Sequence, residues 1–222
     1  MAKHLWLITA KTNLHVGNEN SSGTGVIDQA VQRDALTNLP CIHSSSLKGA
    51  INEYCTNSVK MPKEDRLAVF GSEKETKGGR SQKAGAIFFD AKLLCAPMQC
   101  DDVPYRLAKC KANTEQVIAR ANLLDFNVTE DILCPEGCVD LEWRAFSELC
   151  DDEHLPIIVR NKLENGVSDN LWYEQVVPAE TVFCTIIDDP KDNLTDLLDG
   201  KCVQIGANAT IGYGVCLFTK VL

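Results

Sequence analysis

The sequence has 222 residues, 45% of them hydrophobic and 24% charged, and a formal net charge of −9, an ordinary composition for one soluble domain or one domain with a large insertion. No apolar run approaches the roughly 20 residues that a membrane-spanning helix needs, and the apolar start at residues 5–8 is too short for a signal peptide. We therefore expect a cytoplasmic protein with no membrane partner.

The first third of the chain predicts a strand, a long polar loop and two helices. Residues 5–12 alternate apolar and polar side chains, as a β-strand does. Residues 13–45 are polar and dotted with glycine, which favours loops. Residues 46–59 have apolar side chains at helical spacing and follow two N-cap candidates, Ser45 and Ser46. A second, short helix is expected at residues 64–69.

The middle of the chain predicts irregular insertions between regular elements. Residues 72–84 are polar and glycine-bearing, which predicts a mobile loop, and residues 85–94 have the continuous apolar centre of a central strand. Residues 114–124 predict a helix. Residues 131–133 and 139–146 predict a strand pair, residues 155–162 an extended segment, and residues 167–177 a hairpin arm or bent strand.

The last third predicts strands at residues 181–187, 202–205 and 215–221, with a short helix at residues 193–198. Strands and helices thus alternate loosely along the chain. That pattern suits an α+β fold in which helices cover one face of an antiparallel sheet.

Residues 13–50 hold a candidate anion site. Hydroxyls at Ser44, Ser45 and Ser46 precede a helix with Lys48 near its start, and a helix N-terminus with free N–H groups binds phosphate. Asp28 stands in the preceding loop, with Gln32 and Arg33 after it. A single acid beside a phosphate site suggests chemistry on a phosphodiester.

The glycine-rich segment at residues 204–214 lacks the G-x-G-x-x-G spacing of a dinucleotide fold and does not open a helix. Its glycines either serve only as bulge and turn residues or let a nucleic-acid backbone lie against the protein. In the second case Gly206, Asn208, Thr210 and Gly212 would be contact residues.

Eleven cysteines in a chain without a signal peptide should be mostly free thiols, packed as small hydrophobic side chains. The spacings Cys95/Cys100 and Cys134/Cys138 suggest zinc ligands, but neither is a compact C-x-x-C pair and no histidine lies at ligand spacing. Buried thiols are therefore favoured, and structural zinc is not expected.

A set of short motifs runs along nearly the whole chain: His15-Val16-Gly17, Gly25-Val26-Ile27-Asp28, Val31-Gln32-Arg33-Asp34, Leu39-Pro40, Ser45-Ser46-Leu47-Lys48-Gly49, Phe70-Gly71, residues 85–94, Asn170-Leu171-Trp172-Tyr173-Glu174-Gln175 and the glycine-rich segment. Together they resemble motifs of the RAMP superfamily, and in particular of the repeating backbone subunit of type III-B (Cmr) CRISPR effector complexes. One departure is His43-Ser44, which replaces the usual Pro-Gly before the serines.

The resemblance implies one RAMP domain over residues 1–222, with a ferredoxin-like or RRM-like core and a thumb-like β-hairpin, the thumb and lid segments lying at about residues 95–178. It implies a filament of copies along a CRISPR guide RNA, with other Cmr-type subunits, acting on single-stranded target RNA. Asp28 and His15 match catalytic positions, and Asp28 would also bind a divalent cation, Mg²⁺ or Mn²⁺. The serines and Lys48 match guide contacts, while Tyr173 and Glu174 lie in the motif that would flank the active site.

The function that this resemblance implies is metal-dependent cleavage of target RNA by the target's own 2′-hydroxyl, giving a 2′,3′-cyclic phosphate and a 5′-hydroxyl. A non-catalytic guide-binding scaffold and a guide-processing RAMP nuclease remain alternatives; a small-molecule enzyme is disfavoured because nucleotide-binding motifs are missing.

The charged side chains are unevenly distributed along the chain, and the second part is strongly acidic. Residues 1–90 hold 11 basic and 9 acidic side chains, and residues 91–222 hold 11 and 22. Phosphate neutralisation dominates non-specific RNA affinity, so tight binding should need partner subunits or a preassembled guide. In the loop at residues 72–84, Lys74, Lys77, Arg80 and Lys83 either contact RNA or are only solvated.

Overall fold

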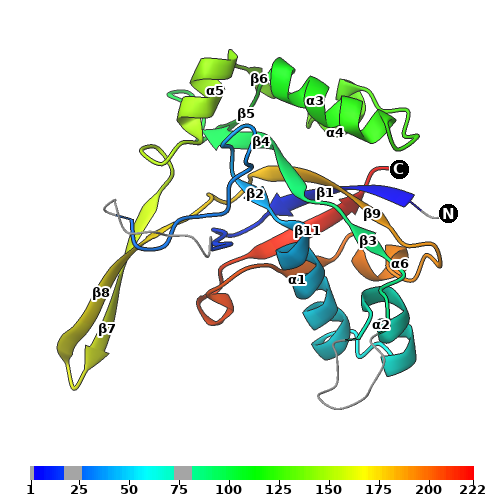
Figure 1. Cartoon of the computed structure of the whole chain (residues 1–222). Helices are drawn as coiled ribbons and strands as arrows, with labels where there is room; N and C mark the ends of the chain where they lie inside the picture. Colours follow the sequence, from blue (N-terminus) through cyan, green and yellow to red (C-terminus); the bar gives the residue numbers. More distant parts are fainter. Residues whose placement is uncertain (1–2, 18–26, 73–81) are drawn as a thin grey trace.

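The protein is described by a computed structural model that covers residues 3–17, 27–72 and 82–222. Its centre is an antiparallel sheet with the strand order β10-β11-β1-β9-β4 (Figure 1). The strands are β1 (Lys3–Ala10), β4 (Ala91–Met98), β9 (Val182–Asp188), β10 (Cys202–Gln204) and β11 (Val215–Lys220), with short β2 (Cys41–Ile42) beside β4 and β3 (Ile87–Phe88) beside β9.

The connections make this core ferredoxin-like. β1 is followed by α1 (Ser44–Asn57) and β4, and β9, which lies between β1 and β4, is antiparallel to both. In the same way α6 (Thr195–Leu198) connects β9 to β11, which flank β1. Two such split βαβ units define the ferredoxin-like topology. The α+β class with this core is therefore confirmed.

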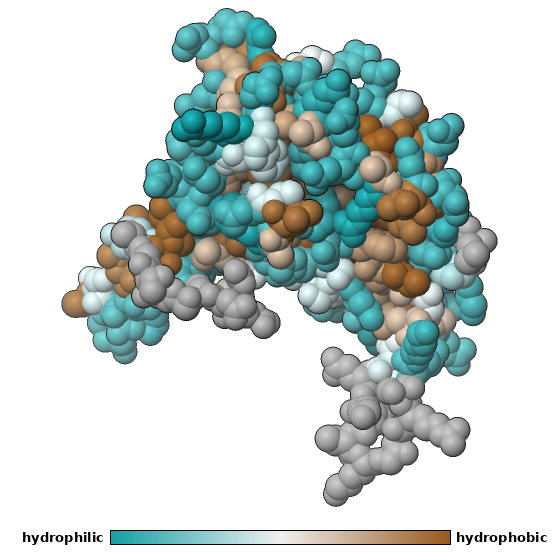
Figure 2. All heavy atoms as spheres, turned by 45° about the horizontal axis from the view of Figure 1, so that its top comes forward, coloured by the Kyte–Doolittle hydropathy of each residue, from teal (hydrophilic) through white to brown (hydrophobic). Residues whose placement is uncertain are grey.

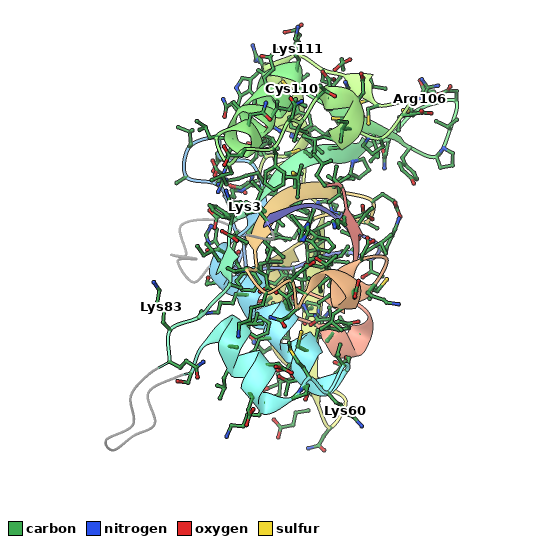
Figure 3. The ribbon with its side chains drawn as sticks, turned by 90° about the vertical axis from the view of Figure 1, so that its right-hand side faces the viewer. Lys3, Lys60, Lys83, Arg106, Cys110 and Lys111 are labelled. Carbon is green, nitrogen blue, oxygen red and sulfur yellow. The ribbon has the colours of Figure 1, made fainter. Side chains whose placement is uncertain are left out.

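One face of the sheet is covered by α1, α2 (Lys63–Phe70) and α6, as Figures 1 and 3 show. Leu47 and Ile51 of α1 pack in the same core as Trp6, Ile8 and Phe218 of the sheet. Successive side chains of a strand point to opposite faces, so Leu5 lies in a second core on the other side.

That second face carries a layer that the sequence did not predict. α3 (Lys111–Asn122) and α4 (Glu130–Leu133) bury Val117, Ala121 and Leu133 against Leu5 and Leu94. The expected placement of helices on one face thus holds for α1, α2 and α6 and not for α3 and α4. The reason is that the central strands are apolar on both faces, and the inserted segment covers the second one.

The segment inserted between β4 and β9 ends in a two-stranded hairpin. It contains β5 (Arg106–Lys109), α3, α4, β6 (Val139–Asp140), α5 (Trp143–Leu149), β7 (Ile157–Glu164) and β8 (Val167–Gln175). β7 and β8 pair from Ile157↔Gln175 to Glu164↔Val167, and the arm extends away from the sheet (Figure 1). Asn165 and Gly166 both have positive φ, as a tight hairpin turn requires.

Three predicted elements differ from the structure. The strand pair expected at residues 131–133 and 139–146 is instead α4, the two-residue β6 and α5, because periodicity cannot separate such short apolar runs. The strand expected at residues 85–94 is divided into β3 and β4, and Asp90, between them, accepts a hydrogen bond from the Ser44 N–H. The first helix begins at Ser44 with His43 as its N-cap, so neither Ser45 nor Ser46 caps it.

Within the described residues, no helix is both long and apolar enough to span a membrane. Lys74, Lys77 and Arg80 lie outside the described residues, and Lys83 is exposed ahead of β3 (Figure 3).

Candidate active site and nucleic-acid interface

Asp28 lies at the base of the hairpin, where residues 28–31 run beside the end of β8. The backbone N–H of Asp28 donates to the Tyr173 carbonyl at 3.0 Å, and the Tyr173 N–H donates to Asp28 Oδ2 at 2.8 Å. The Asp28 side chain is exposed. The carboxylate is therefore fixed in position by the hairpin while it still faces outward.

Gln175 holds this segment in place, a role that sequence reasoning missed. Its backbone N–H donates to the Gln29 carbonyl at 2.9 Å, and its side-chain Oε1 accepts from the Val31 N–H at 3.2 Å. Its Nε2 donates to Asp152 Oδ1 at 3.1 Å. The residue is fully buried. The sequence offered one signal for this role, a polar residue at the end of a strand next to apolar residues. A sequence does not show, however, whether such a residue is buried.

His15 and Glu174 are buried beside the segment that carries Asp28, and the half-buried Asn208 contacts Glu174. His15 is 3% exposed, and its Nδ1 donates to the Gln175 carbonyl at 2.7 Å, which leaves Nε2 as the acceptor of the neutral ring. Glu174, 1% exposed, lies with Oε1 3.8 Å from His15 Nδ1 and accepts a hydrogen bond from the Asn208 side chain. The structure thus brings His15 to the hairpin base but buries its ring, which suits positioning rather than direct contact with RNA.

The glycine-rich loop packs back onto the end of the first strand. The Ala207 N–H donates to the His15 carbonyl at 2.9 Å, and the Gly214 N–H donates to the Asn13 carbonyl at 2.8 Å. Gly206 has φ +80°, and a Cβ there would lie 2.2 Å from the His15 carbonyl oxygen. Thr210 and Gly212 are exposed on the outer turn. At Gly206 a close approach within the protein therefore explains the glycine.

The N-terminus of α1 already holds a carboxylate. The Ser44 N–H donates to Asp90 Oδ1 at 2.8 Å, and Gln32 bonds the His43 N–H and the Ser46 hydroxyl, both at 2.9 Å. Burial acts to raise the pKa of Asp90, but the bonds from Ser44 and Lys92 outweigh it and lower this pKa. Ser45 is exposed and Lys48 half-exposed, so they remain the side chains open to a phosphate.

Arg33 is engaged within the protein. Its Nε donates to Asp152 Oδ1 at 3.0 Å, and its Nη1 donates to the carbonyls of Asn38 and Cys150 at 2.7 and 2.8 Å. These bonds connect the loop before β2 to the end of α5. Arg33 would therefore affect RNA binding indirectly, by holding these two segments in position.

Asp28 can supply one carboxylate ligand to a divalent cation, but the described residues do not supply a full set of ligands. In the part of the chain that the structure describes, no three Cys, His, Asp or Glu side chains converge as a metal-binding group. Mg²⁺ keeps several waters and commonly takes one or two carboxylates together with substrate phosphates. An exposed carboxylate with one oxygen bound by Tyr173 fits that arrangement when RNA supplies the other ligands.

Comparisons with known proteins agree with this fold. The chain is 26% identical to a protein of Pyrococcus furiosus named CRISPR system Cmr endoribonuclease Cmr4, over 90% of each chain. Its fold is similar to a chain of the type III-B Cmr-beta structure bound to cognate target RNA, with TM-score 0.77 and 20% identity over 100% of this chain and 98% of that one. It is also similar to oligomeric Cmr4 from Pyrococcus furiosus, with TM-score 0.72 and 17% identity over 99% of both chains.

The profile of the RAMP superfamily matches residues 7–216. Because that match spans nearly the whole chain, the protein belongs to the RAMP superfamily.

Proposed function

We propose that the protein is the repeating backbone subunit of a type III-B (Cmr) CRISPR effector complex, which binds guide RNA and cleaves complementary single-stranded target RNA. The relative that is named an endoribonuclease and the fold of an RNA-bound Cmr complex support the assignment. The observation that carries the catalytic part is an exposed Asp28 carboxylate, fixed at the base of a protruding hairpin.

Cleavage requires a particular shape of the RNA. The 2′-oxygen must attack in line with the leaving 5′-oxygen, and an A-form duplex does not allow that alignment. The hairpin presents exposed apolar side chains along its length, among them Ile157, Val159, Val167 and Leu171 (Figure 2). Such side chains can take the place of a stacked base and splay out one nucleotide. Correct alignment supplies several kcal/mol of the barrier reduction.

Asp28 then acts on the distorted linkage. The 2′-oxygen attacks the phosphorus, the bond to the 5′-oxygen breaks, and the 5′-oxygen leaves with a proton from water. The free carboxylate oxygen of Asp28 either takes the proton of the 2′-hydroxyl or binds the divalent cation. A divalent cation, Mg²⁺ or Mn²⁺, held by Asp28 and RNA phosphate would stabilise the phosphate charge. His15, Glu174 and Asn208 hold the hairpin base and the glycine-rich loop around this position, while Tyr173 fixes the carboxylate through its backbone N–H.

RNA affinity comes from the assembly rather than from the subunit alone. The chain has a net charge of −9, and sequence is read by base pairing to the guide. Ser45, Ser46 and Lys48 at the start of α1 contact the guide backbone, and copies of the chain repeat these contacts along it.

The test is Asp28→Asn in the assembled complex. Asparagine keeps an oxygen for the Tyr173 N–H, so the hairpin base should stay in place, but it cannot accept a proton. Cleavage of guide-matched RNA should fall by about 10²- to 10⁴-fold while target binding is unchanged. Asp125→Asn is the control, because Asp125 lies in the α3–α4 connection and its side chain is 93% exposed.

If the complex with Asp28→Asn cleaves RNA at the wild-type rate, the subunit is a guide-binding scaffold and not the nuclease. A purified chain that cuts repeat RNA without partners would instead identify a guide-processing nuclease. The products of the wild-type reaction should carry a 2′,3′-cyclic phosphate and a 5′-hydroxyl.

A further inference from the structure

The carboxylate of Asp152 lies between the segment that carries Asp28 and the base of the hairpin, although it belongs to neither. Asp152 is in the link of residues 150–156 that leads from α5 to β7. Its Oδ1 accepts a hydrogen bond from Arg33 Nε at 3.0 Å and lies 2.7 Å from Arg33 Nη2. The same oxygen accepts a hydrogen bond from Gln175 Nε2 at 3.1 Å. One oxygen atom therefore joins the loop before β2, the end of β8 and the link after α5.

The Asp152 carboxylate determines which way round the Gln175 amide lies. An ionised carboxylate accepts hydrogen bonds and donates none, so the end of the amide that faces it must be the NH2 group. The amide oxygen Oε1 then faces the other side, where it accepts from the Val31 N–H at 3.2 Å. In the reversed amide, Nε2 would face the Val31 N–H and Oε1 would face the carboxylate, so both contacts would be repulsive. Asp152 therefore selects the amide orientation that binds Val31.

Gln175 holds the segment that carries Asp28 at two points. Its side-chain Oε1 accepts from the Val31 N–H, and its backbone N–H donates to the Gln29 carbonyl at 2.9 Å. Asp28 lies just before these two points, and its own carboxylate accepts from the Tyr173 N–H at 2.8 Å. Because Gln175 is fully buried, a hydrogen bond that its side chain loses at Val31 is not readily replaced by water. The Val31 contact therefore helps to set the position of the Asp28 carboxylate.

Arg33 keeps the Asp152 carboxylate beside Gln175. The Arg33 side chain is 12% exposed, and its Nη1 donates to the carbonyls of Asn38 and Cys150 at 2.7 and 2.8 Å. The guanidinium is thus fixed by the backbone of two segments as well as by the carboxylate. The Asp152 side chain itself is 57% exposed, and ion pairs open to solvent contribute little to stability. Removal of the carboxylate should therefore change the position of its neighbours more than the stability of the fold.

We propose that Asp152 is a positioning residue for cleavage of the target RNA, because it orients the Gln175 amide that holds the segment with Asp28 against the hairpin. The inference rests on the proposed function, since it concerns the reaction assigned there to Asp28. Asp152 acts through Gln175, and the chemical step stays with Asp28. Without the carboxylate the amide can rotate, Val31 loses its acceptor, and the Asp28 carboxylate no longer has one fixed position. A misplaced carboxylate slows the chemical step and leaves base pairing to the guide intact.

The experiment measures kcat and KM for a guide-matched RNA in the assembled complex. Asp152→Ala should lower kcat by about 10- to 100-fold with an unchanged KM, and the Tm of the subunit should change by no more than about 4 °C. Asp152→Asn should restore cleavage, because asparagine retains an acceptor oxygen that the Arg33 donors keep on the side of Gln175. Glu153→Ala is the matched control: Glu153 is exposed in the same link, and its loss removes the same charge without changing kcat.

A double variant separates a positioning role from a structural one. Asp28→Asn with Asp152→Ala should cleave no more slowly than Asp28→Asn alone, because the position of a carboxylate that has been removed no longer matters. Multiplied losses, a raised KM, a failure to assemble, or no recovery with Asp152→Asn would each overturn the inference. If Asp152→Ala cleaves at the wild-type rate and Asp28→Asn does not, only this inference fails. If Asp28→Asn itself cleaves at the wild-type rate, the proposed function fails with it.

Discussion

The tight approach of the glycine-rich loop to His15 gives a sharp test of the candidate site's architecture. Gly206→Ala places a Cβ 2.2 Å from the carbonyl oxygen of His15, at a residue with φ +80°. The left-handed conformation alone costs an alanine about 1–2 kcal/mol. The carbonyl must also move by about 1 Å, which breaks the 2.9 Å bond from Ala207 N–H to His15 O and costs about 1 kcal/mol more. We expect a loss of about 3 kcal/mol in the free energy of unfolding.

Gly212→Ala is the matched control. Gly212 has φ +82°, but no atom lies within 4 Å of the position that an added Cβ would take, so only the conformational cost of about 1–2 kcal/mol applies. Urea denaturation of both variants measures the difference. In the assembled complex Gly206→Ala should also slow target cleavage, because it displaces Asn208 from Glu174. Equal destabilisation of the two variants would refute the contact between the loop and His15.

Two further predictions concern stability. Burial acts to raise the pKa of Asp34, but the bonds from Lys92 and Thr37 outweigh it and lower the pKa from 3.8 to about 2. This carboxylate therefore contributes about 2 kcal/mol to the free energy of unfolding above pH 4, and that contribution is lost as the pH falls through about 2. Asp34→Asn should lower the free energy of unfolding by that amount at pH 7, and its urea midpoint should approach the wild-type value at pH 2. A difference between the two urea midpoints that stays constant across this pH range would contradict the linkage. Gly49→Ala should raise the free energy of unfolding by about 1 kcal/mol, since Gly49 lies inside α1 with no atom within 4 Å of an added Cβ; a loss of stability in urea would show that the position is more crowded.

The sequence by itself determined the elements whose periodicity is strong. Runs of strand-forming residues located β1, β7, β9 and β11 within a few residues, and apolar side chains at helical spacing located α1 and α3. Motifs around Asp28 and residues 170–175 named two segments that the fold brings together through hydrogen bonds between Asp28 and Tyr173. The resemblance carried by these motifs led to the RAMP superfamily, which the match over residues 7–216 confirms.

Contacts between distant segments were decided by the tertiary structure alone. The cluster of buried His15 and Glu174 with half-buried Asn208 joins three parts of the chain, and no local pattern in the sequence shows which polar side chains will be covered. The sequence predicted an open anion site at the N-terminus of α1, but Asp90, from the link between β3 and β4, accepts a hydrogen bond from its first N–H. Likewise, sequence spacing grouped Cys95 with Cys100, whereas the fold places it beside Cys138. Local periodicity encodes the element to which a residue belongs, but the partners of a side chain depend on how the elements pack.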